Sequence, residues 1–382
     1  MAHRSTVLAQ LLKFIPKAEF KKIVTEYDGD KRCRSLFCWD QFVAMLFAQL
    51  SGCGSLRDLI ERLGSQKSRL YHLGINPVQK SSLADANHSR PMEIYYRLFY
   101  RLLTKLGNDG ESKSLMQDVQ LIDSTTISLC KSQFQWAEFR SHKAGIKLHT
   151  VYDPDADAPV YFQMTSAKVH DSGPVARFPV FASLTYVFDR AYNNADFLKR
   201  LIDSEAFFVG RMKVNMRFTV LETRDPEGDG VQSDELIRVE FKKKSNPLSG
   251  QVLRRIRFIR EHDGKELVFM TNDLKRPAVD IAALYKKRWQ IELFFKWIKQ
   301  NLKIKRFFGT SENAVMIQVL IAMITYLLLR LIQEGMSLSI SLQKIGRNLI
   351  STLMQRRPLR DLFFPEKPNP CVDDSQLDLG LT

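Results

Sequence analysis

The hydrophobic pattern of this 382-residue chain changes near residue 118, and that change limits the folds open to it. In the first hundred residues the apolar side chains recur at helical spacing, as in Leu8, Leu11, Leu12 and Ile15. Beyond the change, short runs of apolar and β-branched residues follow one another. This order predicts an α/β protein in which an all-helical N-terminal domain precedes a mixed sheet.

The helical region contains two helices separated by a glycine-rich turn. One helix is expected to end near Leu50, and Ser55 can cap the next, which begins at Leu56. Helix, short turn and helix together form the outline of a helix-turn-helix. The second helix offers only Arg57 and Arg62 to DNA, so two helices that merely pack together fit the pattern at least as well.

After a linker rich in Gly, Asp and Ser, the pattern predicts three strands in hairpin succession, and then strands alternating with helices. The expected strands are 119–129, 146–152, 160–165, 186–188, 207–211, 236–241, 252–259 and 266–271. Helices are expected over 92–106, over 196–202 and in the polar stretch after the third strand. The last three strands form a β-rich insertion into the sheet domain.

A single long helix is expected to start at Pro277, which suits a first helical turn, and to run to Leu302. The apolar run from Ala314 to Ile332 is interrupted by polar residues, so its uninterrupted part falls short of the ~20 residues that cross a bilayer. We therefore expect a buried core helix and no membrane partner. The expected parts are a helical N-terminal domain (1–80), a helical linker region (81–117), a sheet domain (118–212 and 272–345), the insertion (213–271) and a C-terminal segment with a loose tail (346–382).

The composition indicates a polyanionic partner. A formal net charge of +15 favours nucleic acid, because neutralising phosphates releases condensed counterions. A basic surface that only keeps the protein in solution is the alternative. The five cysteines are scattered without zinc-ligand spacing, and the N-terminus resembles no signal peptide, so a reduced, cytoplasmic protein is expected.

Two acids lie at the ends of apolar strands. Asp123 interrupts the run that begins Leu121-Ile122, and Asp189 follows Tyr186-Val187-Phe188. Burying a lone carboxylate costs several kcal/mol unless it is paired or bound to a metal. Either acid alone would most often cap a strand or pair with an arginine. Two such acids in one domain favour a metal site, because hard cations select oxygen ligands.

The long helix carries a polar stripe at the edge of its apolar face. At about 100° per residue, Tyr285, Arg288, Glu292 and Lys299 fall within roughly a 60° sector. As a simple i, i+4 partner of Lys296, Glu292 would contribute only ~0.5 kcal/mol. The surrounding cations form a positive field that suits a phosphate backbone. They are Lys286, Lys287, Lys296, Lys303, Lys305 and Arg306.

The spacing Tyr, two residues, Arg, three residues, Glu, six residues, Lys is similar to the signature of bacterial insertion-sequence DDE transposases of the insertion-sequence-four family. The layout of residues 82–330 resembles that family as well. The resemblance implies an RNase H-like catalytic domain in which Asp123, Asp189 and Glu292 are the catalytic, metal-binding triad for Mg²⁺, with Mn²⁺ as a substitute. The DNA contacts expected on this helix and beside Asp189 are Tyr285, Arg288, Lys299, Arg190, Lys296 and Lys303.

The resemblance further implies cut-and-paste transposition. The enzyme would cleave double-stranded DNA at terminal inverted repeats and transfer the ends to target DNA, as a homodimer in a synaptic complex associated with the nucleoid. The helical N-terminal domain (1–80) is the candidate for binding the DNA ends. Two other functions fit the same residues: an RNase H-like nuclease without strand transfer, and a transposase-derived DNA-binding protein without catalysis. The base-trapping Trp that the family carries in its insertion has no counterpart, because no Trp lies within 213–271.

No protein nucleophile is expected. Ser124 has no histidine near it in the sequence that could act as a base. A histidine-based site could be made from His142, His149 and His170 with Asp171, but these histidines are expected to be structural or to face DNA.

Overall fold

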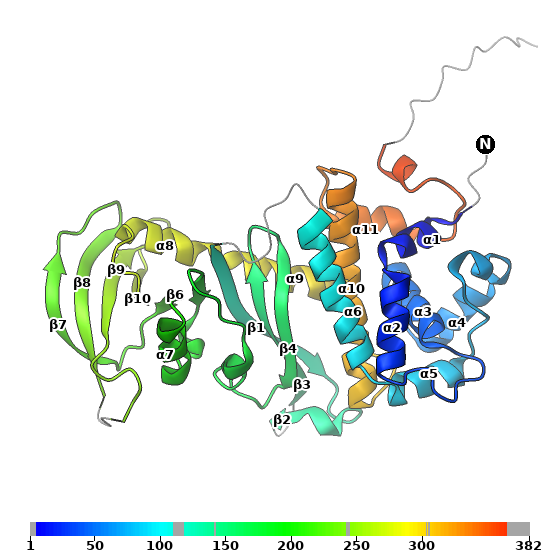
Figure 1. Ribbon diagram of the computed structural model, residues 1–382, viewed down its shortest axis with the longest axis horizontal. Coiled ribbons are helices and arrows are strands. Elements are labelled where there is room, and N and C mark those ends of the chain that lie inside the picture. Colours follow the sequence, from blue (N-terminus) through cyan, green and yellow to red (C-terminus); the bar gives the residue numbers. More distant parts are fainter. Residues whose placement is uncertain are drawn as a thin grey trace, which may run out of the picture.

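The computed structural model describes residues 5–109, 118–140, 143–241, 245–302, 304 and 306–364. The molecule is elongated, with helices at one end, a large mixed sheet in the middle and a β-rich region at the other end (Figure 1). This arrangement confirms the predicted α/β class and the helical N-terminal region.

The helical end begins with six α-helices and two 3₁₀ turns. They are α1 (Val7–Leu11), η1 (Leu12–Phe14), α2 (Lys17–Glu26), α3 (Cys38–Ser51), α4 (Leu56–Gly64), η2 (Lys67–Leu73), α5 (Lys80–Ser89) and α6 (Glu93–Asp109). Gly52 ends α3 in the left-handed region at φ 70°, which glycine adopts without steric cost. Ser55 then caps α4 by accepting a hydrogen bond from the Asp58 amide. The predicted helix, turn and helix are confirmed.

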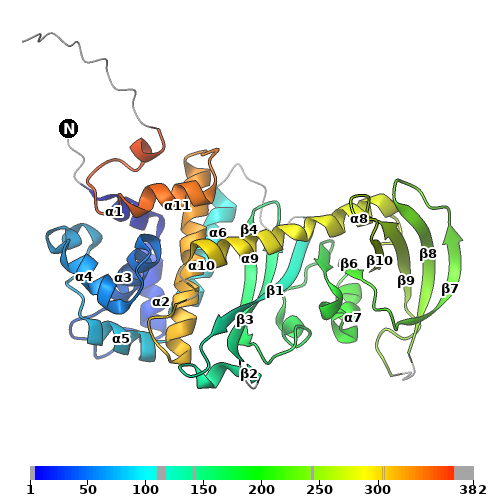
Figure 2. The same cartoon turned by 180° about the vertical axis from the view of Figure 1, so that it is seen from behind.

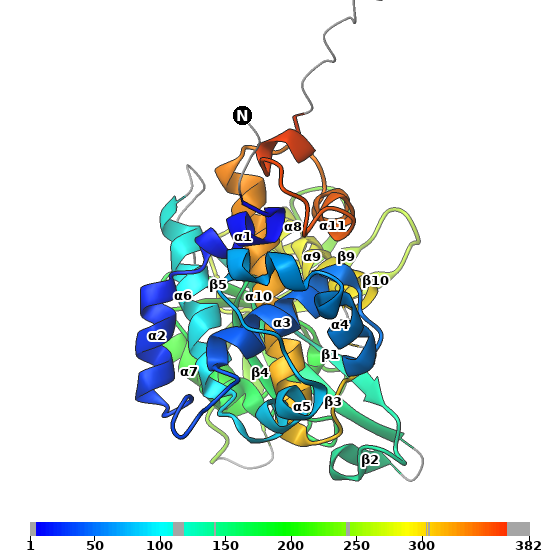
Figure 3. The same cartoon turned by 90° about the vertical axis from the view of Figure 1, so that its right-hand side faces the viewer.

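Two C-terminal helices complete this end of the molecule. They are α10 (Glu312–Gly335) and α11 (Leu342–Ile350). α10 packs against α3, α5 and α6, and α11 packs against α3 (Figure 3). α10 is long and apolar enough to cross a membrane, but 94% of its apolar window is buried inside the molecule. The predicted core helix is therefore found.

The sheet is continuous from the centre to the far end. Its strands are β1 (Val119–Leu129), β2 (Glu138–Arg140), β3 (Lys143–Asp153), β4 (Ala158–Ser166), β5 (Thr185–Phe188), β6 (Phe207–Arg211), β7 (Arg217–Arg224), β8 (Val231–Glu240), β9 (Val252–Ile259) and β10 (Glu266–Thr271). The order is β2-β3-β1-β5-β6-β10-β9-β8-β7, with β4 paired to β3. β5 runs parallel to β1 and β6, and the other pairs are antiparallel. The inserted strands thus extend the central sheet through the β6–β10 pair.

Two helix predictions were wrong. The polar stretch after Thr165 forms only the short turn η4 (Pro174–Arg177), because Gly173, Pro174 and Pro179 do not support a longer helix. The long helix is divided into α8 (Ala278–Lys287) and α9 (Trp289–Asn301) at Arg288. There the amide of Ile291 bonds to the carbonyl of Arg288, three residues back, so the helix tightens without turning away (Figure 2).

The two faces of the central sheet are covered by different helices. Tyr152 of β3 packs on Phe294 of α9, with ring centroids 5.1 Å apart. On the opposite face, Phe188 of β5 packs on Phe197 of α7 (Ala195–Asp203), at 5.8 Å. Because side chains alternate along a strand, the position after Phe188 turns toward the face that carries α9.

Candidate active site

Strand pairing places the two strand acids side by side. In the parallel pair of β1 and β5, Ile122 lies opposite Phe188, so the next positions are Asp123 and Asp189. Neighbouring strands lie about 4.8 Å apart, and residues in the same register face the same side. Asp189 leaves the strand and caps the turn η5 (Arg190–Tyr192), where its Oδ1 accepts a hydrogen bond from the Ala191 amide at 2.7 Å.

The break between α8 and α9 brings the third acid to the same place. Arg288 donates from Nη1 to Oδ2 of Asp123 at 3.0 Å and from Nη2 to Oε1 of Glu292 at 2.5 Å. Its guanidinium therefore joins an acid of the sheet to an acid of the helix. Their side chains are only 20% and 32% exposed. This pairing was not predicted, because the sequence does not show which acids face the stripe.

The electrostatics show that the three acids share one site. Burial raises the pKa of Asp123 to about 6, although the hydrogen bond from the Ser124 amide and the positive charge of Arg288 act to lower it. The negative charges of Asp189 and Glu292 raise it further. Among the described residues, no three acidic, histidine or cysteine side chains are close enough to enclose a metal ion as they stand. The donor set nevertheless suits a divalent cation, because its negative charge is balanced here only in part by Arg288.

The other predicted contacts surround this cluster to different degrees. Tyr285 lies beside Arg288, whose guanidinium carbon is 5.6 Å from the ring centre. Arg190 directly follows Asp189, and its buried Nε has no hydrogen-bond partner. On α9, Lys299 is half-buried and Lys296 is exposed. Lys303 lies outside the described residues, as does His142.

A second polar cluster lies on the opposite face of β1, directly behind Asp123. Ser124 donates to Oδ1 of Asp171 at 2.6 Å, and Nζ of Lys147 lies 3.2 Å from the same oxygen. Nδ1 of His149 is 3.7 Å from it. The sequence gave no signal for this cluster, because only the β1–β3 register places Ser124 opposite His149. Ser124 was expected to lack a nearby histidine, and this expectation was wrong, because His149 lies beside it on the neighbouring strand.

The cluster is not built as a nucleophilic triad. Ser124 donates directly to the carboxylate, so its proton is not held by the imidazole. Burial lowers the pKa of His149 to about 4, so the ring is neutral. Burial alone would raise the pKa of Asp171, but hydrogen bonds from Ser124 and Lys147 hold it below its usual value. The cluster is a fixed support behind the acid.

A separate cavity of about 670 Å³ lies between the helical end and the loop before β2. Asn87, Trp136 and Ser311 are among its lining residues, and none of the three acids is. The acids lie beneath α9 on the central sheet, outside this cavity.

Comparison with known proteins identifies the family. Residues 114–328 match the family model described as "Transposase DDE domain", and residues 3–76 match one described as "Domain of unknown function (DUF4372)". The chain therefore belongs to the DDE transposase family. It is a DNA transposase of the insertion-sequence type, and this family acts on DNA with divalent metal ions.

Relatives align over most of their length. The chain is 37% identical over 315 residues to a putative transposase, y4zB, of Sinorhizobium fredii (strain NBRC 101917 / NGR234), covering 81% of this chain and 86% of that protein. It is 28% identical to a probable transposase for insertion sequence element IS5377 of Geobacillus stearothermophilus, covering 86% and 85%.

A solved structure shares the fold. The cryo-EM structure of the piggyBac transposase synaptic complex with hairpin DNA superimposes with a TM-score of 0.51 at 12% identity, covering 97% of this chain and 87% of that one.

Proposed function

We propose that this enzyme is a cut-and-paste transposase of the insertion-sequence-four family, with an RNase H-like sheet and the triad Asp123, Asp189 and Glu292. One observation carries the assignment of the site. The β1–β5 register, together with the ion pairs of Arg288, brings the three acids from three separate elements to one region of the sheet beneath α9. The spacing of Tyr285, Arg288, Glu292 and Lys299 resembles the helical signature of that family and supports the proposal.

The three carboxylates would hold divalent cations, most simply Mg²⁺, with Mn²⁺ as a substitute. When bound, two such ions supply an activated nucleophile and a stabilised leaving oxygen at the phosphodiester. The protein contributes a rigid frame. Asp123 is held through the Ser124 amide at 2.8 Å, and Asp189 through the Ala191 amide. Both carboxylates are thus oriented before DNA arrives.

Arg288 has two successive roles in this proposal. Before metal binding, its guanidinium balances Asp123 and Glu292 and keeps the helix junction beside the sheet. Divalent cations held by the same acids would balance their charge in its place, and the guanidinium would then be free to bind a DNA phosphate next to Tyr285. Lys299, two turns along α9, would contact a further phosphate, and Arg190, Lys296 and Lys303 would add contacts around the site.

The substrates are terminal inverted repeats in double-stranded DNA and a target duplex, and the active assembly is a homodimer associated with the nucleoid. A nuclease without strand transfer is the rival function. The positive stripe beside the acids favours the transposase, because a cleaved end must stay in place for its 3′-hydroxyl to attack the target.

The test is an excision and joining assay. The purified protein receives Mg²⁺ and a donor plasmid carrying the inverted repeats of its own element, together with a target plasmid. We expect excision followed by joining. Ca²⁺, with its larger and looser coordination, should permit assembly on the ends but no chemistry. Cleaved ends that are never joined would assign the nuclease function, and binding without cleavage in Mg²⁺ or Mn²⁺ would assign the non-catalytic one.

A further inference from the structure

Two segments far apart in the sequence contribute exposed cations to the helical end, where hydrogen bonds join η2 to the segment that follows α11. We call the surface that they form the end surface; α11 lies at the helical end in Figure 3. The end surface consists of residues of η2, of α11 and of the segment that follows α11. These are Lys67, Arg69, Tyr71, His72, Lys344, Arg347 and Arg356.

The two segments are tied together by hydrogen bonds. The amide of Leu8 bonds to the carbonyl of Leu353 at 2.8 Å, and Nη1 of Arg69 bonds to the carbonyl of Met354 at 3.0 Å. Nη2 of Arg356 donates to the hydroxyl of Tyr71 at 3.0 Å. The side chain of Tyr71 is held by this bond while 65% of the residue stays exposed. The end surface is therefore preorganised.

The charge of the end surface is not neutralised internally. In the part of the chain that the structure describes, no Asp or Glu forms a salt bridge with any of its lysines or arginines. Burial lowers the pKa of His72, and the charges of Arg356 and Arg69 lower it further, so the three groups lie within one positive field. Cations elsewhere in the helical end do have acidic partners, such as Lys22 with Glu19 and Arg62 with Asp58.

We propose that the end surface binds the phosphate backbone of double-stranded DNA in the part of the transposon end beyond the cleavage site. This inference rests on the proposed function. Unpaired, preordered cations beside an exposed tyrosine hydroxyl are donors to phosphate oxygens, which supply most contacts at protein–DNA interfaces. The end surface has two parts. The residues of η2 lie within 3–76, the range that matches a domain of unknown function, and the residues of α11 and of the segment after it form the other part.

A surface that meets a protein partner would be built differently. The cores of protein–protein interfaces are depleted in lysine. An acidic protein partner would need a carboxylate opposite each of the cations spread over this surface. Duplex DNA presents one phosphate charge about every 1.7 Å along its axis and fits such a field without sequence-specific partners. DNA is therefore the occupant that the charge favours.

The experiment uses the full chain and end duplexes shortened stepwise from the side away from the cleavage site. The variant Lys67→Gln/Arg356→Gln leaves Arg69 and its packing bond intact. A second variant, Lys344→Gln/Arg347→Gln, lies on another element and guards against misfolding of the first. The matched control is Lys21→Gln/Lys22→Gln, which removes the same charge from α2, a helix that packs on α6.

On the long duplex we expect each end-surface variant to bind roughly tenfold more weakly, and its slope of log affinity against log salt to fall by about 2. Shortening the duplex should cost the wild-type protein the same affinity and slope, but should cost the variants little. On an unrelated duplex of equal length, the variants should lose as much affinity relative to the wild type as they do on the end duplex, because phosphate contacts carry no sequence information. The control should behave as the wild type.

Variants that respond to duplex shortening as the wild type does would overturn the inference. So would unchanged salt slopes with an altered oligomeric state, because the end surface would then be a protein interface. A wild-type protein that neither binds nor cleaves its own ends would instead refute the proposed function. The two failures are thus distinguishable.

Discussion

The β-rich insertion and the end surface are both rich in cations, yet they use positive charge in opposite ways. In the insertion and its turns, five arginines pair with acids: Arg224 with Glu222, Arg254 with Asp234, Arg255 with Glu235, Arg257 with Glu266, and Arg260 with Asp263. The described residues of the end surface have no such partners. The net charge of +15 therefore indicates DNA only where the fold leaves cations unpaired.

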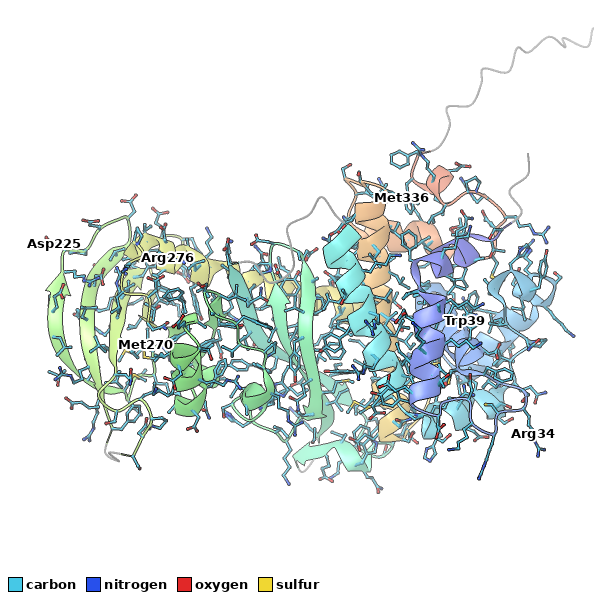
Figure 4. The ribbon with its side chains drawn as sticks, viewed as in Figure 1. Arg34, Trp39, Asp225, Met270, Arg276 and Met336 are labelled. Carbon is cyan, nitrogen blue, oxygen red and sulfur yellow. The ribbon has the colours of Figure 1, made fainter. Side chains whose placement is uncertain are left out.

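In the insertion, a buried ion pair stabilises the start of the helix that leads to the candidate active site. Arg254 and Asp234 are 4% and 6% exposed, and Nη1 of Arg254 also donates to the carbonyl of Arg276 just before α8. Figure 4 shows Arg276 where the inserted strands meet α8. The insertion thus fixes the start of α8, which continues through Arg288 into α9.

The largest contrast should be between the three proposed catalytic acids and an acid of the insertion. We expect Asp123→Asn, Asp189→Asn or Glu292→Gln to lower the cleavage rate by on the order of 10³-fold or more, because metal ligation supplies several kcal/mol of transition-state stabilisation. Binding to the end should change little. Glu222→Gln, the same chemical change on an exposed pair, is the control. Nicking of one labelled end duplex in Mg²⁺ compares the acid variants with this control. If a variant keeps its nicking activity, the residue that it replaces does not belong to the triad.

Within the insertion, the buried pair should matter far more than the exposed one. Arg254→Ala leaves Asp234 buried and unpaired, which should lower the free energy of unfolding by ~3–5 kcal/mol. Arg257→Ala breaks a pair that is 42% and 44% exposed and should cost under ~1 kcal/mol. Urea unfolding compares the two. Equal losses would mean that the buried pair does not anchor α8.

Asp123, unlike the insertion pairs, should reduce stability when no metal is present. The folded-state pKa of Asp123 is about 6, above the ~3.9 of an unfolded Asp. Its stabilising contribution is therefore complete below about pH 4 and lost as the pH rises through 6. With chelator present, Asp123→Asn should be more stable than the wild type by of order 2 kcal/mol at pH 8 and show no gain at pH 4. Thermal unfolding at both pH values tests this, and an equal difference at both would contradict the pKa assignment.

The sequence predicted the elements well where the pattern was strong and poorly where tertiary contacts decide. β1, β6, β9 and β10 begin and end as predicted, because their apolar runs are bounded by clear turns. β7 was not predicted, because its alternation of polar and apolar residues covers only Arg217 to Val220 and most of its residues are exposed.

The candidate site shows the same division. Asp123 and Asp189 stand out in the sequence because a carboxylate next to a run of buried apolar residues is unusual, and the β1–β5 register gives them neighbouring positions. Asp123 was predicted at the end of a strand, but it lies inside β1 and pairs with Thr150 of β3, because β1 continues to Leu129. The pairing of Arg288 with two acids and the role of Asp171 depend on the approach of distant segments. No local pattern encodes either contact.

The support behind Asp123 should have a moderate effect on catalysis. Asp171→Asn weakens the bond that fixes Ser124, whose amide orients Asp123, and should lower the cleavage rate about tenfold, the equivalent of one hydrogen bond. A positioning residue should also raise the Mg²⁺ concentration needed for half-maximal cleavage and weaken Mn²⁺ binding measured without DNA. Asp171→Glu should restore part of both. Lower stability with unchanged metal affinity would assign Asp171 to the fold alone.

The smallest expected effect is on the salt dependence of DNA binding, where replacing a cation of α9 should differ from replacing a cation of the insertion. Lys299 lies on the polar stripe with Glu292, so Lys299→Ala should lower the slope of log affinity against log salt by about 1 on a cleaved end. Lys286, on the same long helical run but off the stripe, should contribute much less. Arg257→Ala in the insertion should leave the slope unchanged, because that cation already has an acidic partner.

Arg288→Ala is a less direct test, since it also unpairs Asp123 and Glu292. Equal slopes for Lys299→Ala and Arg257→Ala would mean that α9 contributes no more to DNA binding than the neutralised insertion does.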